Sequence, residues 1–283
     1  MITPNTHPQT THPKLNPNLT IGAKAERRGS DAWHLEIPAG SASRYRLAQL
    51  DDYHKLPRKG FPWSPPLRLQ LLARASHQQI PGTWGFGLWN DPFNVKLGFG
   101  SARRIPALPN AAWFFFASPP NYLSLRDDLP THGCLAATFS STAIPAILLA
   151  LAALAAPLLA IPPPARFLRR MARRFVRQSS SSVSVDPMEW HSYGLAWESD
   201  RVRFSLDGQV LLETPIVPVG RLGLVIWVDN QYLALPPDGR FRSGTLENPD
   251  PVWIEGEQLS IGGNSAFLDN SLTDRLQYGA LGK

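Results

Sequence analysis

The chain contains a single cysteine, Cys134, among its 283 residues, so it forms no internal disulfide. It also lacks the positively charged start and following apolar run of a secretory signal. Residues 1–20 are instead rich in Thr, Pro, Asn and His, a composition typical of disorder. We therefore expect a protein of a reducing compartment, either cytoplasmic or peripheral on a membrane. We expect a disordered tail over residues 1–30 and one folded domain over residues 31–283.

Acidic residues are absent between Asp128 and Asp186, and this gap holds the strongest cluster of positive charge. The positive charges of its six arginines add up to the formal net charge of the chain, +6. They are Arg166, Arg169, Arg170, Arg173, Arg174 and Arg177. The rest of the chain is therefore close to neutral. A nucleic-acid surface interleaves basic and aromatic residues across a face, and the strand-like segments lack that pattern. We expect no nucleic-acid partner.

Several catalytic patterns are missing as well. The sequence has no Ser/His/Asp spacing, no glycine-rich phosphate loop and no zinc-ligand pattern, and its seven histidines are scattered. What it does contain is 43% hydrophobic residues, 28 prolines and nine tryptophans. The hydrophobic content supports a sizeable core, and the prolines favour short strands joined by turns over an all-helical protein.

Alternating or compact apolar segments predict the strands. In the first half of the chain they lie at residues 33–38, 45–50, 67–75, 82–89 and 111–117. In the second half they lie at residues 190–197, 202–206, 210–213, 223–228 and 252–261. Glycines alternate with large rings around Trp84 and Trp89, which indicates a face that another group approaches closely. Asp207-Gly208 predicts a tight hairpin.

Two consecutive strands carry a family resemblance. The segment Trp-His-Ser-Tyr-Gly-Leu-Ala-Trp at 190–197 precedes Asp-Arg-Val-Arg-Phe-Ser-Leu-Asp-Gly at 200–208. Together they resemble the paired strands of family-16 glycoside hydrolases, and the segments at 223–228 and 253–255 fit later strands of that family. The resemblance implies an all-β protein, an antiparallel β-sandwich of the concanavalin A-like jelly-roll type.

The acids of that family are not where the resemblance requires them. The family places Glu-x-Asp-x-x-Glu on one strand, so that alternation brings the carboxylates to one face. The closest match, Glu198-Ser199-Asp200, has Val202 or Arg203 in place of the third acid. The strand that should carry the motif reads Trp-Phe-Phe-Phe at 113–116. We therefore expect no catalytic residues and a non-catalytic protein that binds a glycan or glycolipid. The alternative left open is a family-16-like hydrolase or transglycosylase with displaced carboxylates at Asp91, Asp229 or Glu255.

Two segments combine an aromatic ring with Asp and Asn, a combination that can stack on a sugar and bind its hydroxyls. Together with Trp84, they predict a ligand site of Trp84, Trp89, Asn90, Asp91, Trp227, Asp229, Asn230 and Tyr232. Trp113 is a residue of the same kind, but core packing is the favoured interpretation for it. The polar members could instead be turn residues. No cofactor is expected, with Ca²⁺ on the Asp and Asn oxygens as the open alternative.

A helical insertion is predicted over residues 140–178. Residues 143–161 are almost entirely Ala, Leu, Ile and Pro, and residues 165–178 form a basic amphipathic pattern. A single membrane span would separate strands that must share one sandwich, so we reject it. The insertion either packs on the sandwich or dips into an anionic membrane surface. The residues predicted to meet that membrane are Phe167, Arg169, Arg170, Met171, Arg173 and Arg174. The serines at 179–182 are expected to form a flexible connection.

Overall fold

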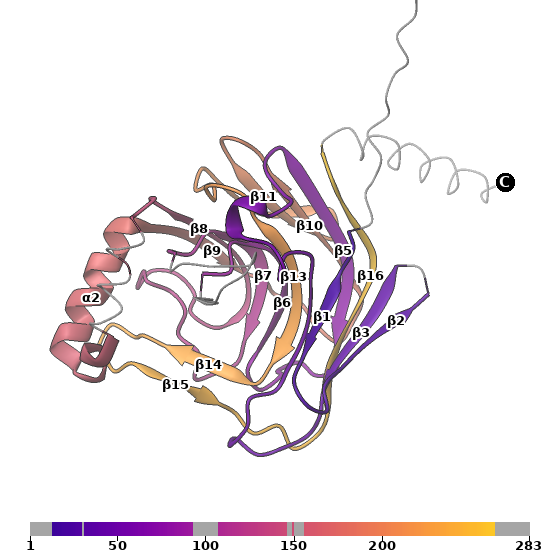
Figure 1. The fold of residues 1–283 in the computed structure, drawn as a ribbon, viewed down its shortest axis with the longest axis horizontal. Coiled ribbons are helices and arrows are strands. Elements are labelled where there is room, and N and C mark those ends of the chain that lie inside the picture. The colour runs from indigo at the N-terminus through magenta and orange to yellow at the C-terminus, as the bar shows by residue number, and fades with distance from the viewer. Residues whose placement is uncertain (1–12, 30, 93–106, 146–148, 150–155, 264–283) are drawn as a thin grey trace, which may run out of the picture.

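A computed structural model describes residues 13–29, 31–92, 107–145, 149 and 156–263. Its main elements are two seven-stranded antiparallel sheets that pack face to face (Figure 1). The first, called the inner sheet, has the order β1 (Asn16–Leu19), β4 (Leu47–Asp51), β13 (Gly223–Asp229), β6 (Thr83–Trp89), β7 (Ala111–Ala117), β8 (Gly133–Ser141) and β9 (Val176–Ser182). Its free face is concave and looks toward the helix α2 (Pro162–Phe175). The predicted β-sandwich is confirmed.

The second sheet, called the outer sheet, covers the convex side of the inner sheet. Its order is β12 (Gln209–Thr214), β11 (Val202–Leu206), β10 (His191–Trp197), β5 (Leu67–Ala75), β16 (Val252–Gly262), β3 (Ala32–Ile37) and β2 (Lys24–Arg28). A two-stranded ribbon of β14 (Gln231–Ala234) and β15 (Arg242–Thr245) projects from β13 toward α2. The described residues also include two 3₁₀ turns, η1 (Arg58–Gly60) and η2 (Ala156–Ala160).

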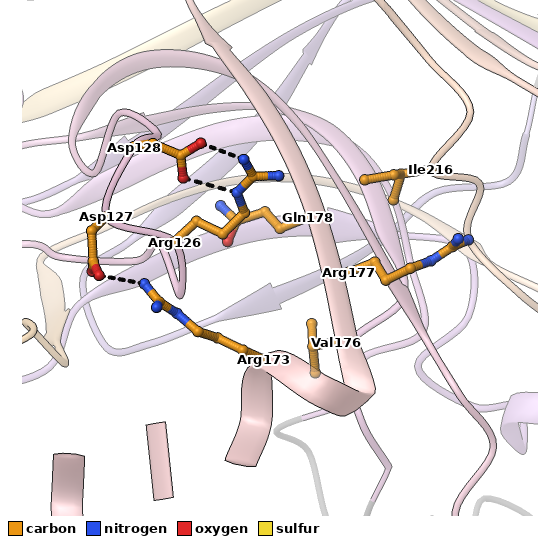
Figure 2. A pocket seen from close by; sticks show the side chains of 8 residues that line it. All are labelled: Arg126, Asp127, Asp128, Arg173, Val176, Arg177, Gln178 and Ile216. Atoms are coloured by element: carbon orange, nitrogen blue, oxygen red, sulfur yellow. Dashed lines mark hydrogen bonds and ion pairs between the residues drawn. The ribbon is translucent and has the colours of Figure 1, made fainter. Parts of the chain in front are cut away.

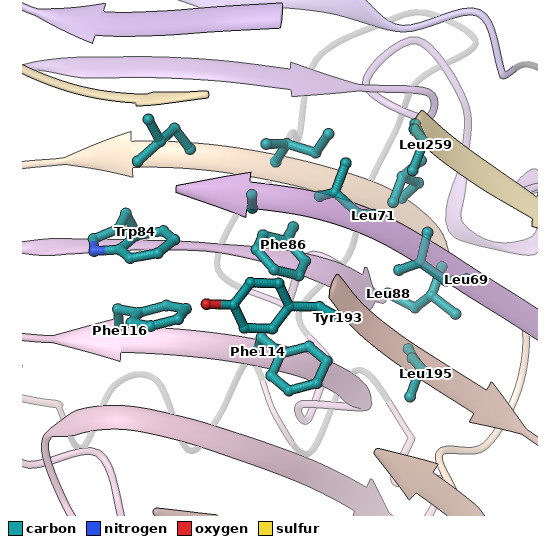
Figure 3. Close-up of a cluster of buried hydrophobic side chains, with 14 of the residues drawn as sticks. Leu69, Leu71, Trp84, Phe86, Leu88, Phe114, Phe116, Tyr193, Leu195 and Leu259 are labelled. Carbon is teal, nitrogen blue, oxygen red and sulfur yellow. The ribbon is translucent and has the colours of Figure 1, made fainter. Parts of the chain in front are cut away.

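The main core lies between the two sheets and is built by strict alternation. Leu67, Leu69 and Leu71 of β5 point inward and are buried, while the residues between them are partly or fully exposed. Facing them from the inner sheet are aromatic residues of β6 and β7, such as Phe86 and Phe114, whose ring centroids are 5.7 Å apart (Figure 3). Because alternate residues enter the core, every other residue of the inner sheet is left to line its concave face.

The strands that carry the family resemblance lie side by side in the outer sheet. β10 pairs with β5 on one side and β11 on the other, and β11 continues into β12 through the predicted hairpin. Asp207 and Gly208 have φ values of 47° and 79°, the left-handed conformations that this tight turn requires. The Asp207 carboxylate accepts a hydrogen bond from the backbone N–H of Ser192, which ties the turn to β10.

The expected N-terminal disorder differs from the structure over residues 13–29. There β1 pairs with β4 and β2 pairs with β3, so these segments extend one edge of each sheet. Their side chains are mostly exposed and polar, and the strands form because the sheet edges offer free backbone groups to pair with. Residues 1–12 and 30 lie outside the described residues.

The connection after α2 also differs from expectation. The serines at 179–182 belong to β9, which pairs with β8 from Val176 to Ser182, so they are not a flexible link. α2 covers residues 162–175 in place of the predicted 165–178. It starts in the three consecutive prolines, which the first turn of a helix tolerates because its N–H groups have no helical partner there. Of the apolar stretch at 143–161, residues 146–148 and 150–155 lie outside the described residues.

Candidate functional site

The concave face of the inner sheet carries a cluster of five rings, called here the aromatic face. Its members come from four adjacent strands and are Trp89 of β6, Trp113 and Phe115 of β7, Phe139 of β8, and Trp227 of β13. Trp113 lies at the centre, with its ring centroid 5.7 Å from Trp89, 5.4 Å from Phe115, 6.1 Å from Phe139 and 5.7 Å from Trp227. Trp89, Trp113 and Phe139 are half-buried, whereas Phe115 and Trp227 are buried beneath or beside them.

Two glycines of β6 make room for this cluster. A Cβ atom at Gly87 would lie 2.6 Å from the Cβ of Trp113, and one at Gly85 would lie 2.9 Å from the Trp227 ring. The glycines therefore let the two indoles lean over β6 from the strands on either side. The close approach that the sequence indicates is real, and its cause is the neighbouring tryptophans.

One end of the aromatic face is held by a buried carboxylate. Asp229, at the end of β13, accepts hydrogen bonds from the Thr83 hydroxyl at 2.7 Å and from the Tyr45 hydroxyl at 3.3 Å. The Thr83 oxygen in turn accepts the indole N–H of Trp227 at 3.0 Å. Burial raises the pKa of Asp229 to about 6, although the hydrogen bond from Thr83 opposes the shift. The series of hydrogen bonds from Trp227 through Thr83 to Asp229 fixes the orientation of the Trp227 ring.

The opposite end of the aromatic face is covered by the loop that follows β4. The indole N–H of Trp89 donates to the Tyr53 hydroxyl, and the Tyr53 ring packs on Phe61 with centroids 4.8 Å apart. Tyr53 and Phe61 are both buried.

The structure exchanges the expected roles of two tryptophans. Trp84, predicted to bind ligand, is only 2% exposed and stacks on Phe116 inside the main core, with centroids 3.5 Å apart (Figure 3). Trp113, for which core packing was favoured, instead lies at the centre of the aromatic face. The reason is the two-residue period of a strand, which puts Trp84 and Trp89 of β6 on opposite faces.

The polar neighbours of the predicted site hold backbone in place. The Asn90 side chain accepts from the Asn110 N–H and donates to Leu108, and Asn230 accepts from the Arg46 N–H. Asp91 follows β6 with φ of 47° and is 3% exposed, and its carbonyl accepts from Arg58. Tyr232 is half-buried on β14, outside the aromatic face. Within the described ranges, no group of three or more His, Cys, Asp or Glu side chains is arranged to hold a metal ion.

The three displaced carboxylates do not form a pair. Asp229 pairs in register with Thr83 at one end of β6, and Asp91 follows Trp89 at the other end. Six residues of strand at about 3.3 Å each separate these ends by roughly 20 Å. Glu255 lies in the outer sheet, where it accepts two hydrogen bonds from Arg74 and contacts His34 and Arg28. Glycoside hydrolysis needs two carboxyl groups within about 10 Å, and these three residues do not meet that requirement.

The residues predicted to contact a membrane divide between two sides of α2. Arg169 is 3% exposed and donates to the carbonyls of Leu235 and Ser124, so it anchors the helix and cannot reach a membrane. Arg173 is half-buried and pairs with Asp127 at 2.6 Å (Figure 2). Arg170 and Arg174 are exposed, Met171 is half-buried and Phe167 is 55% exposed.

Comparisons with known proteins find similar solved structures and no matching sequence family. No protein-family model and no curated protein matches the sequence. The Bacillus licheniformis beta-glucanase structure is similar at 9% identity, covering 93% of this chain and 95% of that one with a TM-score of 0.47. The endo-beta-1,4-glucuronan lyase of the fungus Trichoderma reesei is similar at 9% identity, over 92% and 91% of the chains, with a TM-score of 0.45.

A Bacteroides ovatus GH16 structure, solved with a G4G4G3G product, is similar at 9% identity over 88% and 94% of the chains, with a TM-score of 0.46. The fold is an antiparallel β-sandwich of two seven-stranded sheets. In the part of the chain that the structure describes, no helix is long and apolar enough to span a membrane.

Proposed function

We propose that this jelly roll binds a glycan on the aromatic face without cleaving it. The observation that supports this proposal is the half-buried row of Trp89, Trp113 and Phe139 across three adjacent strands of a concave surface. A sugar ring presents C–H groups that pack against an aromatic face, and a concave row of rings suits successive sugars of a chain. The rigid backing from Phe115 and Trp227 keeps these rings in place without ligand, which lowers the entropy cost of binding.

Binding without cleavage is favoured by the positions of the acids. The concave face of β7 presents Trp113 and Phe115, opposite Gly87 and Gly85 of β6, and β7 contains no acidic residue. Asp229, which holds the Trp227 end of the aromatic face, is 7% exposed and already accepts three hydrogen bonds, from Thr83, Tyr45 and the Gln231 N–H. Its role in the proposal is to position Trp227, and it attacks no sugar.

We further propose that the ligand is presented at an anionic membrane surface, as a glycolipid headgroup would be. Four large apolar side chains are exposed on or beside α2, which lies next to the open side of the inner sheet (Figure 1). They are Leu158 at 44%, Ile161 at 51%, Phe167 at 55% and Phe175 at 39% exposure. Exposed apolar groups flanked by arginine are typical of helices that lie in a membrane interface.

A panel of β-glucans and galactans tests the first proposal by affinity electrophoresis. We expect retardation by at least one polysaccharide, lost in Trp113→Ala and kept in Trp253→Ala. Trp253 is a matched control because it is also half-buried but lies on the outer sheet, beside His34. Release of reducing ends from the retained polysaccharide, abolished in Asp229→Ala, would instead establish a hydrolase.

Sedimentation with vesicles tests the second proposal. We expect the protein to pellet with vesicles of phosphatidylcholine and phosphatidylglycerol, and Phe167→Ser with Phe175→Ser to leave it in the supernatant. The control pair is Val210→Ser with Val219→Ser, which removes two apolar side chains of 57% and 59% exposure elsewhere. Equal pelleting of both double variants would contradict docking through α2.

A further inference from the structure

A hollow of about 480 Å³ lies against the exposed start of α2. It is called here the arginine hollow, and its lining residues are Asp127, Pro163, Arg166, Arg169, Arg170, Arg173 and Pro237. The tip of the β14–β15 ribbon closes one side, where a Cβ at Gly239 would lie 2.4 Å from the Pro162 carbonyl. The ribbon and the loop before β8 thus hold α2 in a fixed position around the hollow.

The charges of the arginine hollow do not balance. Its lining has four arginines and one aspartate, which leaves three positive charges without a counterpart in the lining. Asp127 pairs with Arg169 at 2.8 Å and with Arg173 at 2.6 Å. Although burial opposes it, the hydrogen bonds from Arg173 and Arg169 hold the pKa of Asp127 below its ordinary value, so this carboxylate stays ionised at neutral pH.

Two arginines remain available for a ligand. Arg166 and Arg170 lie one helical turn apart and are both exposed, and across the described segments neither has a hydrogen bond or ion pair. Arg173 is about one third exposed, but its guanidinium already donates to Asp127 and to the Leu125 carbonyl. Guanidinium groups bind phosphate through paired N–H donors. Because Pro162, Pro163 and Pro164 provide no N–H, the arginine side chains must supply the donors.

The exposed apolar side chains beside the arginine hollow indicate which kind of phosphate compound would bind there. Phe167 follows Arg166 directly and is 55% exposed, and Ile161 lies just before the helix at 51%. An acidic glycan or a free ion gains nothing from these apolar groups, whereas a lipid offers acyl chains beneath its phosphate. We propose that the arginine hollow binds the phosphate of an anionic lipid headgroup, an inference that rests on the proposed docking of α2 on a membrane.

The double variant Arg166→Gln with Arg170→Gln tests the site. In sedimentation with phosphatidylcholine vesicles that contain phosphatidylglycerol, we expect affinity to fall on the order of 30-fold, since each basic residue contributes about fivefold at an anionic surface. The control is Arg44→Gln with Lys59→Gln, which removes two exposed positive charges outside α2 and should lower affinity less than threefold. Equal losses in the two variants would show that only diffuse charge matters and would overturn the site.

Inorganic phosphate separates failure of the site from failure of membrane docking. We expect phosphate to shift the amide NMR signals of α2 in the wild-type protein and not in the Arg166→Gln, Arg170→Gln variant. Phosphate shifts without vesicle binding would contradict membrane docking and make a soluble phosphate the occupant. Absence of shifts, or tighter binding to polygalacturonate than to the vesicles, would overturn the proposal.

Discussion

Asp229 links the polar and aromatic parts of the concave face. Its folded-state pKa of about 6 lies above the ordinary value of 3.8 because the carboxyl is buried. Between about pH 4 and pH 6, the Asp229 carboxyl is therefore mostly protonated in the folded protein and mostly ionised in the unfolded chain. The resulting stabilisation is full below the ordinary pKa and is lost as the pH rises through 6.

Asp229→Asn is predicted to remove this part of the pH dependence. In the wild-type protein, ionisation of Asp229 should lower the free energy of unfolding by on the order of 1 kcal/mol as the pH rises from 5 to 7. Urea unfolding of both proteins at the two pH values measures the difference. Asp238→Asn, at an exposed site, is the control and should keep the wild-type slope. If the free energy of unfolding of Asp229→Asn changed with pH as much as that of the wild type, Asp229 would not be the cause of the pH dependence.

Gly87 is the residue on which the position of Trp113 depends. Its φ is 149°, and a Cβ there would lie 2.6 Å from both the Ala112 carbonyl and the Trp113 Cβ. We predict that Gly87→Ala lowers the free energy of unfolding by about 3 kcal/mol and weakens glycan binding, because the indole must move. Gly263→Ala, whose nearest neighbour would be 3.9 Å away, should change stability by less than about 0.5 kcal/mol.

At the scale of an element, α2 shows why an amphipathic pattern does not fix which side faces the protein. The sequence correctly predicts a helix with apolar residues on one side and arginines on the other. The structure turns part of the arginine side inward, toward Asp127 and the carbonyls of Ser124 and Leu235, and leaves Phe167 outward. Those partners are distant in sequence, so no local pattern could reveal them.

Arg169→Met is predicted to destabilise the protein by about 3 kcal/mol, because the buried Ser124 carbonyl, the part-buried Leu235 carbonyl and the Asp127 carboxylate each lose a donor. Arg170→Met, one residue further on the exposed side, should change stability by less than about 0.5 kcal/mol. Thermal and urea unfolding compare the two variants. Similar losses in both would contradict the inward role of Arg169.

For the whole molecule, the sequence predicts the strands whose buried faces are apolar and misses several of the others. β5, β6, β7 and β10 are visible because their buried faces are apolar. The missed strands include the edge strands β2 and β9, in which Lys-Ala-Glu-Arg-Arg or a run of serines gains a backbone ladder and little core contact. They also include β8, which lies between β7 and β9 inside the inner sheet.

The candidate site was predictable in part. Trp89 and Trp227 were found because each stands beside Asp and Asn, and the alternation of β6 already separated Trp84 from Trp89. Phe139 carried no distinguishing signal. Trp113 stands in a run that is apolar on both faces, so its side of the sheet depends on the register with β6 and β8.

The N-terminal strands are predicted to stabilise the sandwich as a whole. A chain that starts at Asp31 loses β1 and β2 and exposes the backbone edges of β4 and β3. We expect its melting temperature to fall by about 6 °C relative to a chain that starts at Lys14, which keeps both strands. Circular dichroism melting measures the difference, and equal melting temperatures would show that the two strands contribute nothing.

The proposed binding face is tested most directly by calorimetric titration of the wild-type protein, Trp113→Ala and Trp253→Ala with the best-retained oligosaccharide. Loss of the central ring should weaken binding by roughly 1–3 kcal/mol, which is about five- to 150-fold in the dissociation constant, because its apolar contact with the sugar is lost. Trp253→Ala should bind as the wild type does. Equal affinity of Trp113→Ala and the wild type would contradict the aromatic face as the glycan site.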